Sequence, residues 1–208
     1  DPSGGSWFVE DLTDQLAQQA WKQFQDLESR GGFVAAREHL STQISEVAAR
    51  RADDIAHRRT ALTGVNEFPN LGEAPLAQAD SRPGVVRYAA AFEALRNRSD
   101  AYLAKTGKRP QAVLLPVGPL AEHNIRTTFA ANLLASGGIE AVNPGTVESA
   151  GVAAAVGSAT AVVLCGTDAR YGTEAGDIVE AARAAGVEHV YLAGPEKSVA
   201  QATHRPDE

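Results

Sequence analysis

Three short segments contain the side chains whose types and spacing could form a binding site. The first contains His123 and Arg126, the second Thr167 and Asp168, and the third ends at Gly194. An imidazole can bind a metal ion, and an arginine near a helix N-terminus can bind a small anion. Each segment directly follows an apolar run, so strands must bring the three together if they form one site.

The C-terminal half of the sequence predicts those strands. Four apolar runs, each closed by glycine, are typical of buried strands: AVLLPVG (112–118), IEAVNPG (139–145), TAVVLCG (160–166) and HVYLAG (189–194). Helices are expected between them, beginning near Ala121, Val147 and Thr173. Short apolar strands that alternate with helices indicate a parallel sheet covered on both faces. We therefore predict an α/β domain with a flavodoxin-like, doubly wound parallel sheet. Four strands are visible where a fifth is usual.

Ligands of such sheets bind at the carboxyl ends of the strands. The expected rim of this site consists of Gly118 with Pro119 to His123, Asn143 to Gly145, Gly166 to Asp168, and Ala193 with Gly194. Neither G-x-G-x-x-G after the first strand nor G-x-x-x-x-G-K-[ST] occurs, which disfavours dinucleotide and P-loop chemistry.

Composition excludes several classes of function. The net charge is −7, with no basic tract, so nucleic-acid binding is not expected. No apolar run reaches about 18 residues, so no membrane span is expected. The single cysteine, Cys165, excludes an internal disulfide and a cysteine-rich zinc site and suits a cytoplasmic setting. The sequence contains no methionine, and we expect it to be a segment of a longer protein.

Residues 1–70 predict a different organisation. A first helix, capped by Asp11 or Thr13, is expected to end at Gly31–Gly32, and a second to run from Phe33 to Arg59. A short strand is expected at Ala61–Phe68 before Pro69. Two helices and a strand are not a self-sufficient fold, but they suit the last part of a larger α/β barrel. Residues 71–110 are predicted to be a linker that contains one helix between Val86 and Leu103.

The sequence resembles a known family over nearly its whole length. The segments DPSGGSWFVEDLT, RRTALTGVNEFPN and LLPVGPLAEHNIRTTFAANLLASGGIEAVNPG are similar to the C-terminal part of the small (beta) subunit of methylmalonyl-CoA mutase. The resemblance implies that residues 1–70 end a (β/α)8 acyl-CoA mutase barrel, 71–110 form a linker and 111–208 form a truncated cobalamin-binding-type domain. It also implies a heterodimer of propionate metabolism. In it the large, catalytic subunit carries adenosylcobalamin and converts methylmalonyl-CoA, the acyl-CoA substrate, to succinyl-CoA.

The family motifs indicate which subunit is resembled. Cobalamin-binding members carry D-x-H-x-x-G after the first strand, and the matching residues here are Ala121, His123 and Arg126. The resemblance implies that the carboxylate that would orient the histidine is missing and that Arg126 stands where the nucleotide tail would pass. A later S-x-L falls on Gly166, Thr167 and Asp168, which places a buried carboxylate beside an apolar ligand face. A final glycine pair falls on Ala193 and Gly194.

We therefore expect a vestigial pocket at these eight positions, with no catalytic residue, no metal and no cofactor bound by this chain. The simpler interpretation of His123 is a hydrogen-bonded structural residue. Thr167 and Asp168 are also suited to capping a helix, and Asp168 to forming an ion pair with Arg170.

Three hypotheses remain open. The first is a non-catalytic subunit with a structural role. The second is a catalytic mutase chain that uses His123 as the lower cobalt ligand. The third is an α/β module that binds another small anion at Arg126.

Overall fold

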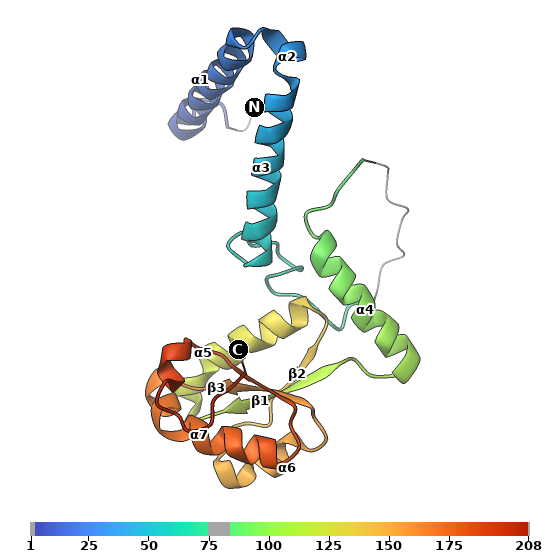
Figure 1. Ribbon diagram of the computed structural model, residues 1–208, viewed down its shortest axis with the longest axis vertical. Helices are drawn as coiled ribbons and strands as arrows, with labels where there is room; N and C mark the ends of the chain where they lie inside the picture. Colours follow the sequence, from blue (N-terminus) through green and yellow to red (C-terminus); the bar gives the residue numbers. More distant parts are fainter. Residues whose placement is uncertain (1–2, 75–83, 208) are drawn as a thin grey trace. The chain divides into compact units, whose positions relative to one another are not determined.

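The computed structural model describes residues 3–74 and 84–207, which include all the segments discussed below except part of the predicted linker (Figure 1). The chain divides into two compact units, Asp1–Asp54 and Ile55–Glu208. The predicted boundaries at residues 70 and 110 are not tested by this division and stay predictions.

The first unit is helical. It contains α1 (Trp7–Ser29), α2 (Gly32–Ala35) and most of α3 (Arg37–Ala56). On α1, pairs four residues apart stabilise the exposed surface, as where Gln15 Nε2 donates to Asp11. Gly31 ends the first helix with a positive φ, as expected. Ala36 is the one buried residue among residues 3–54 of the described chain.

Two predictions for this unit are wrong. The first helix begins at Trp7 after Ser6, so neither Asp11 nor Thr13 caps it. The Thr13 hydroxyl instead donates to the Val9 carbonyl inside the helix. The second helix is interrupted at Ala36, because the chain turns there between α2 and α3.

The strand predicted at 61–68 is also absent. A single bridge joins Thr63 and Glu67, and the segment is a compact turn. The reason is Asn66, which is fully buried. Its side chain accepts from the Leu62 N–H and donates to the carbonyls of Ile55 and Thr60. These bonds fold the backbone back on the end of α3 and replace the ladder of a strand.

The predicted linker contains the expected helix as α4 (Ala90–Thr106), within the second unit. Residues 75–83 of that predicted linker lie outside the described residues. This helix is joined to the α/β fold at the turn after α5 (Leu120–Ser136). The Ser99 hydroxyl donates to the Gly138 carbonyl at 2.5 Å, and Arg109 donates to Ser99 and Asp100. Gly138 has a φ of 83°, and a Cβ there would lie 2.5 Å from the Ser99 side chain, so glycine is needed at this contact.

The rest of the second unit is an α/β module with a four-stranded parallel sheet, as predicted. The strands are β1 (Gln111–Pro116), β2 (Glu140–Val142), β3 (Ala161–Cys165) and β4 (His189–Leu192), in the order β2-β1-β3-β4. The register pairs Val113 with Val142 on one side and with Val162 on the other. This order is that of a flavodoxin-like sheet.

Helices cover both faces of the sheet (Figure 1). They are α5 (Leu120–Ser136), the short η1 (Ser149–Gly151) and α6 (Val152–Val156), α7 (Asp168–Ala184) and η2 (Glu196–Val199). The predicted start near Ala121 is confirmed by α5. The helix expected near Val147 begins later and is short. The one expected near Thr173 begins five residues earlier, because Thr167 caps it.

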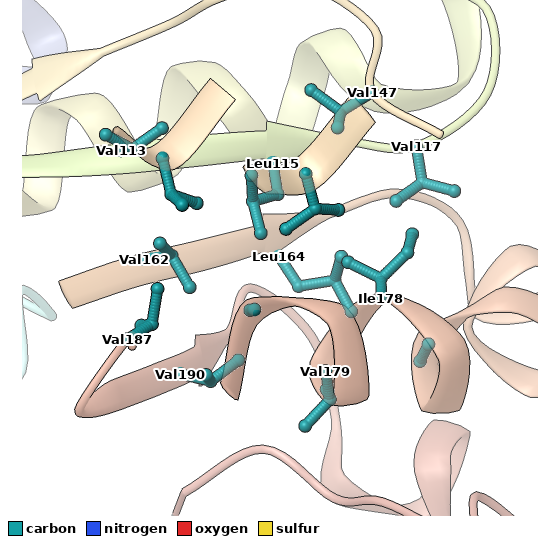
Figure 2. Packing of buried hydrophobic residues seen from close by; sticks show 14 of the residues in the cluster. Val113, Leu115, Val117, Val147, Val162, Leu164, Ile178, Val179, Val187 and Val190 are labelled. Atoms are coloured by element: carbon teal, nitrogen blue, oxygen red, sulfur yellow. The ribbon is translucent and has the colours of Figure 1, made fainter. Parts of the chain in front are cut away.

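Alternate residues of β1 and β3 build two cores. Leu115 and Leu164 pack with Ile178 and Val179 of α7 on one face (Figure 2). Leu114 packs with Ala130 of α5 and with Cys165 on the other face. Burial on both faces explains why β1 and β3 are continuously apolar in the sequence. At the outer edge of β4, the Asp207 N–H donates to the Val190 carbonyl and its carboxylate accepts from the Val190 N–H.

Candidate functional site

The strand order places the candidate site at the carboxyl ends of β1 and β3. From β1 the chain passes through α5 to β2 on one side, whereas β3 lies on the other side of β1. The loops that leave β1 and β3 therefore separate at this edge, which is where doubly wound sheets bind ligands. Gly118 and Pro119 follow β1, and Gly166 and Thr167 follow β3.

Arg126 connects the predicted site residues. Its Nη1 donates to the Gly166 carbonyl at 2.7 Å, and its Nη2 lies 2.5 Å from an Asp168 carboxylate oxygen. Its guanidinium carbon lies 5.0 Å from the centre of the Tyr171 ring. A Cβ built on Gly194 would lie 3.0 Å from Nη1, so the end of β4 approaches the same group. Residues of α5, α7 and the β3 and β4 loops therefore meet at one side chain.

Two predictions for Asp168 are wrong. Its side chain is 52% exposed, so it is not a buried carboxylate. Its ionic partner is Arg126 rather than Arg170, because Arg170 extends toward α5 and its own helix instead. The predicted cap is confirmed at Thr167, whose hydroxyl accepts from the Arg170 N–H at 3.3 Å.

A second ion pair crosses the same edge. Arg170 Nε donates to Glu122 of α5 at 2.8 Å, and its Nη1 donates to Glu174 at 2.8 Å. Gly118 lies beneath this pair with a φ of 81°, and a Cβ there would be 2.9 Å from both charged groups. Each helix therefore supplies one acidic and one basic side chain to the two ion pairs. Glu122 and Arg126 come from α5, and Arg170 and Asp168 come from α7.

Tyr171 is the buried residue that completes this edge. Its hydroxyl accepts from the Gly166 N–H at 2.7 Å and lies 2.9 Å from the Ala193 carbonyl and 3.2 Å from the Leu164 carbonyl. Burial raises the pKa of this hydroxyl, so it stays protonated and can donate. The two carbonyls sit at the ends of β3 and β4, and Tyr171 therefore joins these strand ends where their ladder stops.

The sequence predicted Glu122 only as part of the rim from Pro119 to His123, without an ionic partner. It predicted Arg170 as a partner of Asp168, and it did not predict Tyr171 as part of the site. Glu122 and Arg126 are four residues apart on one helix, and Tyr171 follows the capping Thr167 by four residues. These spacings were available, but the partners lie 42 and 48 positions apart in the chain. Only the pairing of β1 with β3 brings them together.

His123 is buried in the first turn of α5, with 3% of its surface exposed. The hydrogen bond that a structural role predicts is not found at Nδ1, which has no partner among the residues that the structure describes. Ala121, where the motif would place an orienting carboxylate, is exposed. Glu122 does not replace that carboxylate, because it pairs with Arg170.

The charged groups at this edge are held in their ionised forms. Hydrogen bonding to Arg170 lowers the pKa of Glu122. Burial lowers the pKa of Arg126, but its interactions with Asp168 and Tyr171 outweigh this effect and leave it raised. Cys165, fully buried at the end of β3 as expected, has its pKa raised to about 12 by burial. It is therefore a packed neutral thiol and not a nucleophile.

Neither a metal-binding cluster nor a membrane-spanning helix is found among the described residues. No group of three or more His, Cys, Asp or Glu side chains within residues 3–74 and 84–207 is arranged to hold a metal ion. Over the same residues, every helix is too short or too polar to cross a membrane.

The fold defines a flavodoxin-like α/β module, with two ion pairs between α5 and α7 at the carboxyl ends of its central strands. Residues 1–108 match the family model described as methylmalonyl-CoA mutase, and the chain belongs to that family.

Relatives agree with this assignment. A protein of Mycobacterium tuberculosis named "Probable methylmalonyl-CoA mutase small subunit" is 67% identical over 211 residues, covering 100% of this chain and 34% of the relative. The small subunit of Streptomyces virginiae is 43% identical, covering 93% of this chain and 33% of the relative. The large subunit of Propionibacterium freudenreichii subsp. shermanii is 41% identical over 78 residues, covering 36% of this chain and 11% of the relative. The chain spans about a third of the length of the small subunits it matches.

Proposed function

We propose that this chain is part of a non-catalytic small subunit of an adenosylcobalamin-dependent methylmalonyl-CoA mutase. In this proposal it binds no cobalamin. It pairs with a large subunit that carries the cofactor and isomerises methylmalonyl-CoA to succinyl-CoA. The names of the similar proteins support the small-subunit assignment and the existence of a large partner. The structural role and the lack of cofactor rest on the site itself.

The residues at the carboxyl ends of β1 and β3 do not fit a corrinoid. A bound cobalamin would need open space for its nucleotide tail beside α5, and Arg126 extends across that space to Gly166 and Asp168. It would also need an imidazole oriented by a carboxylate, and position 121 is alanine. The loss of such an orienting partner typically costs about 10–100-fold in metal affinity or activity. The Arg126 bonds to Gly166 and Asp168 are the observation on which the proposal rests.

Exposed apolar surfaces support a role in assembly. In the first unit Trp7, Phe8 and Trp21 are all exposed, although tryptophan and phenylalanine usually pack inside a protein. On the second unit, α5 exposes Ile125, Phe129 and Leu133, which are four residues apart and share one helix face.

We propose that residues 1–70 complete a (β/α)8 barrel, that 71–110 link it to the module, and that 111–208 form the degenerate cobalamin-type domain.

Cofactor titration tests the proposal directly. Full-length small subunit, large subunit and their complex would each be titrated with adenosylcobalamin and followed by absorbance. We expect no spectral change with the small subunit alone and binding stoichiometric with the large subunit in the complex. Tight, stoichiometric binding by the small subunit alone would overturn the proposal.

One observation favours a second candidate function, a catalytic chain with His123 as the lower cobalt ligand. That observation is the buried Nδ1 of His123 without a partner. His123→Ala in the assembled enzyme separates the two candidates. Unchanged turnover and cofactor content support the structural subunit, and loss of cobalamin supports the ligand role.

Anion binding at Arg126 is not favoured, because both terminal nitrogens of its guanidinium are already bonded.

A further inference from the structure

The Arg126 side chain makes every type of contact that a bound guanidinium ligand would make. One terminal nitrogen donates to a backbone carbonyl, that of Gly166, and the other to a carboxylate, that of Asp168. The planar group lies over the Tyr171 ring. Such charge-assisted bonds are stronger than neutral ones, and only arginine among the side chains combines a fork of donors with stacking.

Gly194 shows that the surrounding chain is fitted to this group. A Cβ at Gly194 would lie 2.8 Å from Tyr171 Cε2 and 3.0 Å from Arg126 Nη1. The backbone of Gly194 does not have a positive φ, so its conformation does not require glycine. The small residue is therefore explained by the space that the arginine and the tyrosine occupy.

We propose that Arg126 is a built-in ligand of the α/β module. Its guanidinium occupies a site formed by the Gly166 carbonyl, the Asp168 carboxylate, the Tyr171 ring and the backbone of Gly194. By filling this site from inside, it holds the ends of β3 and β4 to α5. The site is selective for a small planar cation of the guanidinium class, and it becomes available when the side chain is removed.

Chemical rescue of Arg126→Ala in the full-length protein tests this proposal. We expect the substitution to increase deuterium exchange in peptides covering 161–171 and 189–194 and to lower the Tm of the module by roughly 5 to 10 °C. Millimolar guanidinium or methylguanidinium chloride should restore part of the lost protection in both peptides. Equal concentrations of methylammonium chloride or sodium chloride should not.

Arg170→Ala is the matched control, since Arg170 also forms ion pairs across this edge. The structure gives it no bond to a strand-end carbonyl and no ring beneath it among the described residues, so we expect a smaller loss of protection and no specific response to guanidinium. The proposal is overturned if Arg126→Ala leaves both peptides as protected as in the wild type. Equal recovery with methylammonium, or an equal guanidinium response of Arg170→Ala, would also overturn it.

If Arg126→Ala does not fold, Arg126→Lys provides the test. Lysine retains the charge but lacks the planar fork, so we expect increased exchange in both peptides. Wild-type protection with lysine would show that charge alone is sufficient and would overturn the proposal. None of these outcomes depends on cobalamin. The proposal that the chain is a non-catalytic subunit is therefore tested independently of the proposal for Arg126.

Discussion

The two compact units differ in what they bury, although both contain long amphipathic helices. In Asp1–Asp54, Ala36 is the one buried residue of the described part, and large aromatic side chains face outward. In the α/β module, α7 packs Ile178 and Val179 against Leu164 of β3. A helical pattern is therefore sufficient to form a helix, but a core requires a second layer that covers the apolar face.

Removal of a central core side chain tests this difference most strongly. Leu164 is fully buried at the centre of the sheet, and we expect Leu164→Ala to lower the free energy of unfolding of the module by about 2–5 kcal/mol through lost transfer energy and a cavity. Leu16→Ala on exposed α1 should change the free energy of unfolding of the first unit by no more than about 0.5 kcal/mol. Urea unfolding of both variants measures this, and equal losses would remove the distinction between the units.

Tyr171→Phe tests whether polar contacts add to the core at the sheet edge. The variant leaves the Gly166 N–H and the Ala193 carbonyl without their partner in a buried place. We expect a loss of about 1–3 kcal/mol. Tyr191→Phe is the control, since Tyr191 is 42% exposed on β4 and should be nearly neutral. Similar values for the two variants would argue against a specific role for the Tyr171 hydroxyl.

A smaller effect is expected at the start of α7. Thr167→Ala removes the oxygen that accepts from the Arg170 N–H, and caps of this kind contribute about 1 kcal/mol. Thr173 lies inside the same helix, where its hydroxyl only bonds back to carbonyls of that helix. Thermal unfolding should thus distinguish Thr167→Ala from a nearly neutral Thr173→Ala, and the reverse order would contradict the assigned cap.

The rate of cysteine labelling compares a buried position in the α/β module with an exposed position in the first unit. At pH 8, Cys165 should be unreactive toward thiol reagents, because it is buried and its pKa is raised to about 12. A cysteine introduced by Ser41→Cys on exposed α3, in a Cys165→Ala background, should react at once. Rapid labelling of folded Cys165 would contradict the packed core.

The same thiol gives a pH dependence with a definite sign. Its folded pKa of about 12 is above the ordinary value of 9.0, so the folded state retains the proton while the unfolded state loses it. The stability that the neutral thiol contributes is complete below pH 9 and is lost as the pH rises through 12. Urea unfolding at increasing pH should show a steeper decline for the wild type than for Cys165→Ala.

The fold of the α/β module was predictable because its two central strands, β1 and β3, are buried on both faces. Continuous apolar runs closed by glycine identified β1 to β4, and Gly31 marked the end of α1. The segment 61–68 was predicted wrongly, since a run rich in strand formers says nothing of Asn66 bonding to Ile55 and Thr60. Local side-chain bonds replaced the strand there, and one of their partners, Ile55, lies at the end of α3.

At the candidate site, the available chemical groups can be read from the sequence: an arginine at position 126, an alanine at 121 and a histidine at 123 on the helix after the first strand. Their contacts follow only from the folded arrangement of the strands. Arg126 and Asp168 are 42 residues apart and Glu122 and Arg170 are 48 apart, and they meet because β1 and β3 are adjacent parallel strands. Hydrophobic periodicity reports the environment of each residue along its own element, whereas the choice of ionic partner depends on distances across the sheet.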